Sequence, residues 1–338
     1  MTRLERLQRG GIRRLGTPKQ GFTYETADGG HVKAADLERI EKLKIPPAWT
    51  EVAIHPSPRA SLQAIGKDAA GRWQYLYHEA HTRRQEQKKF ERLMQFAEAL
   101  PAMRRTIARQ LAQPGLGREK VMASILRILS TCFIRPGSQV YATENGSYGI
   151  ATLRRKHVTV KGDLVTFDFT GKHGKRQLRE LRDRSVARVV KQLMDLPGYE
   201  VFKYVNEQGE VVDIKRRHIN QYIKEVMGQQ FSAKDFRTWA GTLICACALA
   251  RAGVEEVESD TTRNKKLVGA VKEAARHLGN TPAVCRSSYI YPSVLTSFEK
   301  GRVVERYFDN VEELVKHKKR GLHPSEKALL NFLKDKAA

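Results

Sequence analysis

The spacing of a phosphate-binding loop occurs in this chain at GKDAAGRW, residues 66–73. Such a loop needs Lys and then Ser or Thr after its second glycine, where this chain has Arg72 and Trp73. We therefore exclude a nucleotide site of that type. The sequence also lacks an HExxH zinc pair, an EF-hand loop, an acidic cluster able to hold paired Mg²⁺ and a GxSxG nucleophile turn. These exclusions remove most of the ordinary ways to transfer a phosphoryl or acyl group.

What remains is chemistry that uses cations and a side-chain nucleophile. Arginines can bind the non-bridging oxygens of a phosphodiester through two parallel hydrogen bonds and spread the charge of a pentacoordinate phosphorus. A tyrosine suits as the nucleophile, because its phosphodiester resists hydrolysis yet remains a fair leaving group for the reverse reaction. The ordinary pKa of its hydroxyl is about 10, so neighbouring positive charge must favour ionisation. The chain has 11 tyrosines, and composition alone does not choose among them.

The chain carries a large excess of positive charge. Its 338 residues include 61 Lys and Arg against 37 Asp and Glu, a formal charge of +24. Residues 1–90 have 17 Lys and Arg against 10 Asp and Glu, a net charge of +7, and residues 91–338 have the remaining +17. Because both parts are basic, the charge is not confined to a tail, and a nucleic acid is the expected partner. Two domains with generally soluble basic surfaces are the alternative explanation.

The sequence predicts a globular protein of the cytoplasm. It has no run of about 18 apolar residues, and its basic N-terminus has neither the apolar core nor the cleavage site of a signal peptide, so we expect no membrane partner. Four cysteines, Cys132, Cys245, Cys247 and Cys285, lie among apolar residues without CxxC pairing or histidines at metal-ligand spacing. They are predicted to be buried thiols and not zinc ligands or disulfides.

The elements that must position the reactive groups divide the chain into two predicted domains, 1–90 and 91–338. In residues 21–78, apolar and polar residues alternate between Gly- and Pro-rich turns, which predicts strands and turns of a small antiparallel sheet. From about 79 to 111 the sequence changes to a charged helix, which places the boundary near 80–92. The second domain is predicted to be mainly helical, with helices at 118–133, 183–195, 216–228, 235–252 and 264–278.

A sheet interrupts these helices at residues 157–181, which predict a three-stranded meander with GKHGK at the tip of its second hairpin. Ser232 and Asp235 have the spacing of a capping box, Gly279 is expected to end a helix, and Thr281-Pro282 is expected to begin a short helix carrying Tyr289. The predicted fold class is α+β. A small N-terminal domain has an antiparallel sheet plus helices, and a larger C-terminal domain is mainly α-helical with the meander.

Five sequence segments indicate which tyrosine, arginines and lysine are the candidate catalytic residues. They occur in the order 45–78, 133–158, 169–175, 234–242 and 278–292, and carry the motifs IPPAW and QYLYH, FIRPG, FTGKHGK, KDFRTW, and LGN with SSYIYP. Together they closely resemble the poxvirus-type and bacterial type IB DNA topoisomerases over about residues 21–300. The resemblance implies a two-domain enzyme that closes around double-stranded DNA as a clamp. It also implies that the catalytic domain has the fold shared by type IB topoisomerases and tyrosine recombinases. It implies a monomeric, nucleoid-associated enzyme that nicks one strand, lets the duplex rotate and reseals it without a nucleotide, metal or other cofactor.

The resemblance also assigns catalytic roles. Tyr289 in SSYIYP resembles the nucleophile that forms a 3′-phosphotyrosyl link and releases a 5′-hydroxyl, with Tyr291 as the competing tyrosine. Arg135 in FIRPG and Arg237 in KDFRTW resemble the two arginines that bind the scissile phosphate. Lys172, at the predicted hairpin tip, resembles the general acid that protonates the departing 5′ oxygen.

Other assignments leave alternatives open. Asn280 occupies the position where poxvirus and eukaryotic relatives usually have histidine, and it could donate an uncharged hydrogen bond to a phosphate oxygen or simply follow the end of a helix. Lys175 shares the hairpin tip and is predicted to contact DNA, with a lesser claim to be the acid. Gln74, Tyr75 and Tyr77 resemble a DNA-facing strand. Alternation places the two tyrosines on one face and Gln74 on the other, and a core role for one tyrosine is the alternative.

Two other functions compete with this one. A tyrosine recombinase also uses two arginines, a lysine and a tyrosine, but it usually has His-x-x-Arg at the second arginine, where this chain has Lys234 before Arg237. The IPPAW and QYLYH segments have no recombinase counterpart. A non-enzymatic DNA-packaging protein would use the positive charge alone and would form no covalent adduct with DNA.

Overall fold

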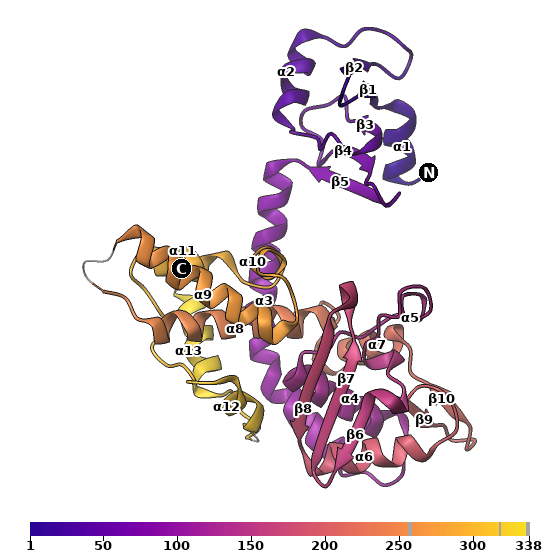
Figure 1. The fold of residues 1–338 in the computed structure, drawn as a ribbon, viewed down its shortest axis with the longest axis vertical. Helices are drawn as coiled ribbons and strands as arrows, with labels where there is room; N and C mark the ends of the chain where they lie inside the picture. The colour runs from indigo at the N-terminus through magenta and orange to yellow at the C-terminus, as the bar shows by residue number, and fades with distance from the viewer. Residues whose placement is uncertain (256–258, 318, 336–338) are drawn as a thin grey trace. The chain divides into compact units, whose positions relative to one another are not determined.

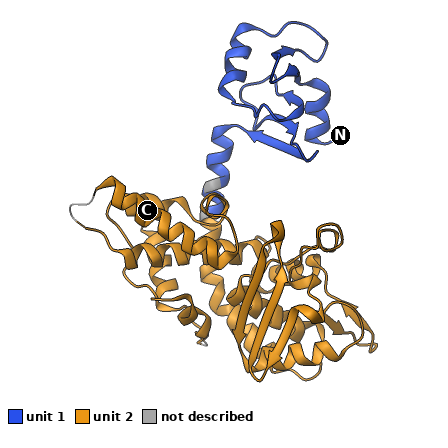
Figure 2. Ribbon diagram, in the orientation of Figure 1, with its two compact units in different colours: residues 1–89 blue, residues 90–338 orange. Residues whose placement is uncertain are grey.

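The computed structural model describes residues 1–255, 259–317 and 319–335, and the chain forms two compact units, residues 1–89 and 90–338 (Figure 2). Helix α3, Glu79–Leu111, runs from the first unit into the second. Buried apolar side chains form separate cores in the two units.

The first unit is built on a five-stranded antiparallel sheet with strand order β2-β1-β3-β4-β5. Two helices, α1 and α2, contribute Leu7 and Ile40 to its buried core. The expectation of strands and turns throughout 21–78 is wrong at α2, whose short apolar face is flanked by glycines and prolines. The elements are α1 (Arg3–Gly10), β1 (Ile12–Thr17), β2 (Gly21–Glu25), α2 (Ala34–Lys42), β3 (Thr50–Ile54), β4 (Leu62–Lys67) and β5 (Trp73–Tyr77).

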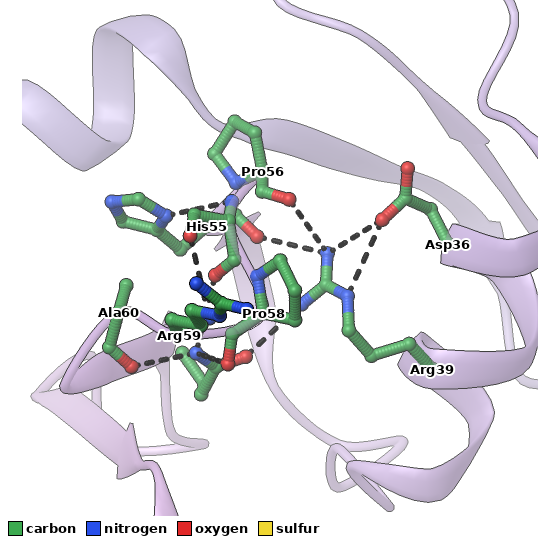
Figure 3. A network of polar contacts seen from close by, with 9 residues as sticks. Asp36, Arg39, His55, Pro56, Pro58, Arg59 and Ala60 are labelled. Carbon is green, nitrogen blue, oxygen red and sulfur yellow. Dashed lines mark hydrogen bonds and ion pairs between the residues drawn. The ribbon is translucent and has the colours of Figure 1, made fainter.

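Arg39 on α2 holds the loop between β3 and β4 (Figure 3). Its guanidinium donates to the carbonyl oxygen of His55 at 2.9 Å and to Oε1 of Gln63 at 3.0 Å, and it pairs with Asp36 at 3.2 Å. Gln63 is 2% exposed and donates from Nε2 to the carbonyl oxygen of Ala60 at 2.6 Å. The network satisfies buried polar groups and ties the loop to the helix.

The second unit is mainly helical (Figure 1). Its central helix, α8, is buried along its whole length from Asp235 to Ala250, as expected for a helix that is apolar on all sides. The helices are the remainder of α3, then α4 (Arg118–Cys132), α5 (Gln139–Asn145), α6 (Arg184–Asp195), α7 (Arg216–Met227), α8 (Ala233–Ala252), α9 (Asp260–Leu278), α10 (Pro282–Ser288), α11 (Pro292–Glu299), α12 (Val311–Lys316) and α13 (Pro324–Lys334). A short hairpin, β9 (Lys203–Val205) and β10 (Val211–Asp213), lies between α6 and α7.

The predicted meander is confirmed. Strands β6 (Val158–Lys161), β7 (Leu164–Thr170) and β8 (Arg176–Arg182) pair antiparallel in that order and lie side by side in Figure 1. Their inward residues, among them Val165 and Phe167, are buried against the core that includes α4 and α6. The second hairpin ends in a single 3₁₀ turn, Lys172–Gly174.

The predicted helices are present, and the α+β fold class is confirmed. Several helix boundaries differ from the sequence prediction by a few residues. Helix α9 begins at Asp260, and its N-terminus is capped by the hydroxyl of Ser259. Helix α4 ends at Cys132, because Phe133 adopts a left-handed conformation with φ +55°. Helix α10 ends at Ser288, so Tyr289 caps it instead of lying within it. All four cysteines are buried and free, as predicted.

Candidate active site

Arg135, Arg237 and Asn280, which are remote in sequence, meet in the second unit. Arg237 lies in the second turn of α8 and is only 3% exposed. Ser232 and Asp235 cap that helix in the predicted capping box, which fixes where its first turn begins. Arg135 follows the end of α4, and Asn280 follows the end of α9. Three helix termini thus present two cations and one amide to the same point.

Gly279 sets the position of Asn280. It ends α9 in the left-handed conformation, with φ +61°, which confirms the predicted helix end. Its N–H donates to the carbonyl oxygen of Arg276 at 3.1 Å, and the N–H of Asn280 donates to that of Ala275 at 2.9 Å. This pair of bonds is a Schellman motif, which favours glycine at the left-handed position. The helix end therefore fixes the backbone from which the Asn280 side chain reaches the arginines.

The side-chain oxygen of Asn280 accepts hydrogen bonds from both arginines. Nη2 of Arg135 donates to Oδ1, and Nη2 of Arg237 donates to it at 3.2 Å. A guanidinium can only donate, so the oxygen and not the amide nitrogen must face the two cations. Nδ2 is then left as a buried donor without a hydrogen-bond partner in the described part of the chain. An unpaired buried donor beside two guanidinium groups is arranged to bind an anion.

Arg237 is held by the backbone as well. Nη1 donates to the carbonyl oxygen of Phe133, and Nη2 donates to that of Leu278 at 2.8 Å. The left-handed conformation of Phe133 therefore supplies an acceptor for the guanidinium. Burial lowers the pKa of Arg237, and the like charge of Arg135 lowers it further. Because the ordinary pKa of arginine lies so far above neutral, the group stays charged at pH 7.

Tyr289 lies against Arg237. The guanidinium carbon is 5.0 Å from the centre of the phenol ring, which is the range of a cation–π contact. Burial acts to raise the pKa of the Tyr289 hydroxyl. The opposing effect comes first from Arg237, through its charge and its hydrogen bonding, and then from the charges of Arg135 and Lys234. Together they bring that pKa below its ordinary value. The cluster thus favours the ionised, nucleophilic form of this tyrosine.

Helix α8 also seats the backbone of Tyr289. Oγ1 of Thr242 lies 3.2 Å from the Tyr289 carbonyl oxygen and accepts the N–H of Tyr291 at 3.1 Å. Gly241 leaves room for the same segment, because a β-carbon there would lie 2.7 Å from the Tyr289 carbonyl oxygen. One helix therefore carries Arg237 and positions Tyr289. Tyr291 is the N-cap residue of α11 and packs against the core.

Lys172 and Lys175 lie exposed at the tip of the second hairpin of the meander. The N–H of Gly171 donates to the carbonyl oxygen of Lys175 at 2.8 Å, which closes the tip. Within the described residues, neither lysine side chain forms a hydrogen bond or ion pair. The structure therefore places Lys172 where the sequence predicts a hairpin tip, but it does not join the ammonium to the arginine cluster.

The predicted DNA-facing strand of the first unit is β5. Tyr75 and Tyr77 are 45% and 46% exposed, and their rings lie nearly parallel with centres 6.4 Å apart. The predicted alternation is confirmed, and the alternative of a core role for one tyrosine is wrong. Gln74 donates from Nε2 to Oδ2 of Asp68 at 2.8 Å. Asp68 also accepts the backbone N–H groups of Ala70 and Arg72, so the excluded phosphate-loop spacing forms a turn around a carboxylate.

Sequence analysis missed two polar residues that face inward from β8. Gln177 is 6% exposed, and Arg179 donates to the carbonyl oxygen of His277 at 3.1 Å. Burial lowers the pKa of Arg179, and the nearby charge of Arg135 contributes to the shift. Leu178 between them points outward and is 51% exposed. A signal exists in the sequence, since the period-two pattern of β8 puts polar residues on the face that carries Leu181.

The described residues contain no group of three or more His, Cys, Asp and Glu side chains that could hold a metal ion. Over the same residues, none of the helices combines the length and apolar character needed to cross a bilayer.

Comparison with known proteins gives two family matches that together cover most of the chain. Residues 78–320 match the family described as eukaryotic DNA topoisomerase I, catalytic core, and residues 21–68 match the bacterial DNA topoisomerase IB, N-terminal domain. DNA topoisomerase 1B of Acanthamoeba polyphaga mimivirus is 36% identical over 88% of this chain and 88% of its own length. DNA topoisomerase 1B of vaccinia virus (strain Copenhagen) is 22% identical over 76% of this chain and 80% of its own. The chain therefore belongs to the type IB DNA topoisomerases, and not to the tyrosine recombinases or DNA-packaging proteins.

Proposed function

We propose that this topoisomerase relaxes supercoiled duplex DNA through a transient 3′-phosphotyrosyl nick, with Tyr289 as the nucleophile and Arg135, Arg237 and Asn280 binding the scissile phosphate. The observation that carries the proposal is the arrangement around Asn280. Its oxygen aligns two guanidinium groups, and its unpaired Nδ2 is a third donor on the same anion site. Three preorganised donors can stabilise charge that develops on the non-bridging oxygens in the transition state.

The proposed reaction is a reversible transesterification. The ionised oxygen of Tyr289 attacks the phosphorus, a Tyr–O–P bond forms, and the bond from phosphorus to the 5′ oxygen breaks. Lys172 donates a proton to that leaving oxygen, so a 5′-hydroxyl is released. After the free strand end has rotated, the 5′-hydroxyl attacks the phosphotyrosine and returns its proton to Lys172. The bond energy is conserved in the protein–DNA link, so the cycle needs no ATP, metal or other cofactor.

The remaining assignments concern DNA binding and location. We propose that residues 1–90 form a DNA-clamp domain, which contacts duplex DNA through Gln74, Tyr75 and Tyr77. Residues 91–338 form the proposed catalytic domain, in which Lys175 makes a further contact with DNA. The exposed pair of tyrosines on β5 supports this role, since exposed aromatic rings can pack on bases or sugars. The proposed enzyme is a monomer that acts in the cytoplasm on the nucleoid.

Plasmid relaxation with covalent trapping tests this function. The protein is incubated with negatively or positively supercoiled plasmid in EDTA without ATP, stopped with SDS, and digested so that the DNA-linked peptide can be sequenced. We expect relaxed circles from both substrates and a peptide joined through Tyr289 to a 3′ phosphate. The proposal is wrong if relaxation requires ATP or metal, if the link is to a 5′ phosphate, or if another residue carries the adduct.

The rate of DNA cleavage should depend on the ionisation of Tyr289. Because the pKa of this phenol lies below its ordinary value, the rate is expected to rise with pH and to level off once the phenolate predominates. Replacing Lys234 with Ala removes one positive charge that lowers this pKa, so the profile should move to higher pH. Single-turnover cleavage rates across a pH series measure the shift. Lys161→Ala, an exposed change at the far end of β6, should leave the profile in place, and an unmoved Lys234→Ala profile would contradict the argument.

A methyl group at Gly241 should displace the nucleophile. In Gly241→Ala the added carbon would lie 2.7 Å from the Tyr289 carbonyl oxygen and 3.1 Å from the Tyr289 β-carbon, so the tyrosine segment must move. Displacements of this kind cost about 100-fold in rate, which is the expected loss in single-turnover cleavage. Gly269→Ala in α9 is the matched control, because nothing lies within 4 Å of its added carbon. Equal rates for the two variants would show that Gly241 does not position Tyr289.

A further inference from the structure

We propose that Gln177 is a positioning residue that holds the hairpin of Lys172 against the turn of Asn280. The inference rests on the proposed roles of Lys172 and Asn280, and it adds a residue that those roles do not include. Gln177 lies near the start of β8, where that strand leaves the hairpin tip, and its side chain points inward. It thus lies on the element that carries the proposed general acid.

The side chain of Gln177 lies between two glycines. A β-carbon on Gly171 would lie 2.8 Å from Cγ of Gln177, and one on Gly279 would lie 2.2 Å from its Oε1. With a side chain at either glycine, Gln177 would have to move from its present position. Gly171 immediately precedes Lys172, and Gly279 immediately precedes Asn280. One side chain therefore touches the residues before both proposed catalytic groups.

Hydrogen bonds fix the orientation of the Gln177 amide. Nε2 donates to the carbonyl oxygen of Arg176 at 3.2 Å, and Nη2 of Arg179 donates to Oε1 at 2.9 Å. Because arginine can only donate, Oε1 must face Arg179. The same Nη2 of Arg179 donates to the carbonyl oxygen of His277, in the last turn of α9. The amide is thus linked through Arg179 to the helix whose end carries Asn280.

The two sides of this contact are not equally anchored. Gly279 and Asn280 are fixed by the Schellman motif and by the hydrogen bonds from the arginines. The Lys172 and Lys175 side chains at the tip are exposed and form no hydrogen bond or ion pair among the described residues. The backbone of the tip is held by Oγ of Ser147, which donates to the carbonyl oxygen of Gly171 at 3.2 Å, and by Nε2 of Gln177, which donates to that of Lys175 at 3.4 Å. Removing the Gln177 side chain therefore frees the hairpin more than the turn. The expected defect is poor placement of the Lys172 ammonium at the leaving oxygen.

A DNA substrate whose leaving group needs no proton distinguishes a role of Gln177 in positioning Lys172 from a purely structural role. Gln177→Ala should slow single-turnover cleavage of ordinary DNA by about 10- to 100-fold, the range expected for misplacing one acid. On DNA with a bridging 5′-phosphorothiolate at the cleavage site, whose sulfur leaves without protonation, its rate should return to within about threefold of the wild-type rate on that substrate. The affinity for DNA should change by less than about threefold. Thr159→Ala, an exposed change on β6, should leave both rates unchanged.

Lys172→Ala, measured on both substrates, distinguishes failure of this inference from failure of the proposed function. If Lys172→Ala is not rescued by the phosphorothiolate, the general-acid assignment and the inference both fail. If Lys172→Ala is rescued but Gln177→Ala is slowed equally on both substrates, or is not slowed, only the inference fails. The double variant should cleave ordinary DNA within about twofold of Lys172→Ala, because the two changes remove the same contribution.

A second variant keeps the test decisive if Gln177→Ala does not fold, as judged by thermal unfolding. Gln177→Met retains most of the side-chain volume between the two glycines but loses the hydrogen bonds of the amide. It should show a smaller slowing on ordinary DNA that the phosphorothiolate also removes. An unslowed Gln177→Met, or slowing that persists on the phosphorothiolate, overturns the proposal.

Discussion

Tyr289→Phe is expected to lower the rate of DNA cleavage by at least about 10⁴-fold and to leave no protein–DNA adduct in SDS. The substitution removes only the hydroxyl that would bond to phosphorus, and no other group in the cluster can replace a lost nucleophile. The ring that lies over Arg237 is kept, so the fold and the affinity for DNA should be unchanged. Plasmid relaxation, adduct formation and DNA affinity are measured on the same preparation.

Tyr291→Phe is the matched control for this experiment. Tyr291 lies two residues away, is the N-cap residue of α11 and is partly buried like Tyr289. Its variant should relax plasmid at a rate within a few-fold of wild type. Relaxation by Tyr289→Phe together with its loss in Tyr291→Phe would transfer the nucleophile to Tyr291. Loss in both variants, with adduct formation retained by one, would identify which tyrosine reacts and which supports it.

Arg237→Lys is expected to lower the rate of cleavage by about 100- to 1,000-fold, although it keeps the positive charge. An ammonium lacks the planar fork that reaches the carbonyl oxygens of Phe133 and Leu278 and the Oδ1 of Asn280 together. The loss corresponds to removal of one preorganised donor from a transition-state anion site. Single-turnover cleavage at saturating enzyme isolates this effect from DNA binding.

Arg251→Lys is the matched control for Arg237→Lys, because it also replaces a guanidinium on α8 with an ammonium. Arg251 lies near the other end of α8, where it donates to the carbonyl oxygen of Phe308 at 3.1 Å and pairs with Glu273 at 2.6 Å. Its variant should lose about 1–2 kcal/mol of unfolding free energy from broken hydrogen bonds while cleaving DNA at the wild-type rate. Cleavage rates lowered equally in both variants would mean that Arg237 acts through the stability of α8 and not at the phosphate.

The sequence predicts the elements that follow a strong local pattern. The meander and helices α4, α6 and α7 follow from hydrophobic periodicity, and α8 follows from its capping box and its long apolar sequence. The end of α9 follows from the conformational preference of Gly279. The candidate site residues follow only from family resemblance, because isolated residue types do not reveal which side chains three helix ends and a hairpin bring together: Tyr289, Arg135, Arg237, Lys172 and Asn280. The hydrogen bonds of Asn280 depend on tertiary contacts 145 and 43 residues apart in sequence.

The remaining features depend on packing that one sequence does not encode locally. Gln177 and Arg179 face inward although Leu178 between them is apolar, because hydrogen bonds compensate for their burial. Arg179 donates to the carbonyl oxygen of His277 at the end of α9 and to Oε1 of Gln177, whose Nε2 donates to the carbonyl oxygen of Arg176. Helix α2 is short, and its burial of Ile40 against the sheet outweighs the turn-forming residues around it. Phe133 adopts the left-handed conformation although the residue type does not favour it, so tertiary packing and not the local sequence determines its backbone.

The amide at position 280 has a consequence for acid stress. A histidine there would gain a proton in mildly acidic surroundings and would then place a third cation beside two guanidinium groups. An amide neither gains nor loses a proton in that range, so the charge of the cluster stays constant when the pH falls. The proposed anion site therefore has no titrating side chain at position 280, and we expect the pH dependence of strand cleavage to reflect the phenol of Tyr289, the proposed nucleophile.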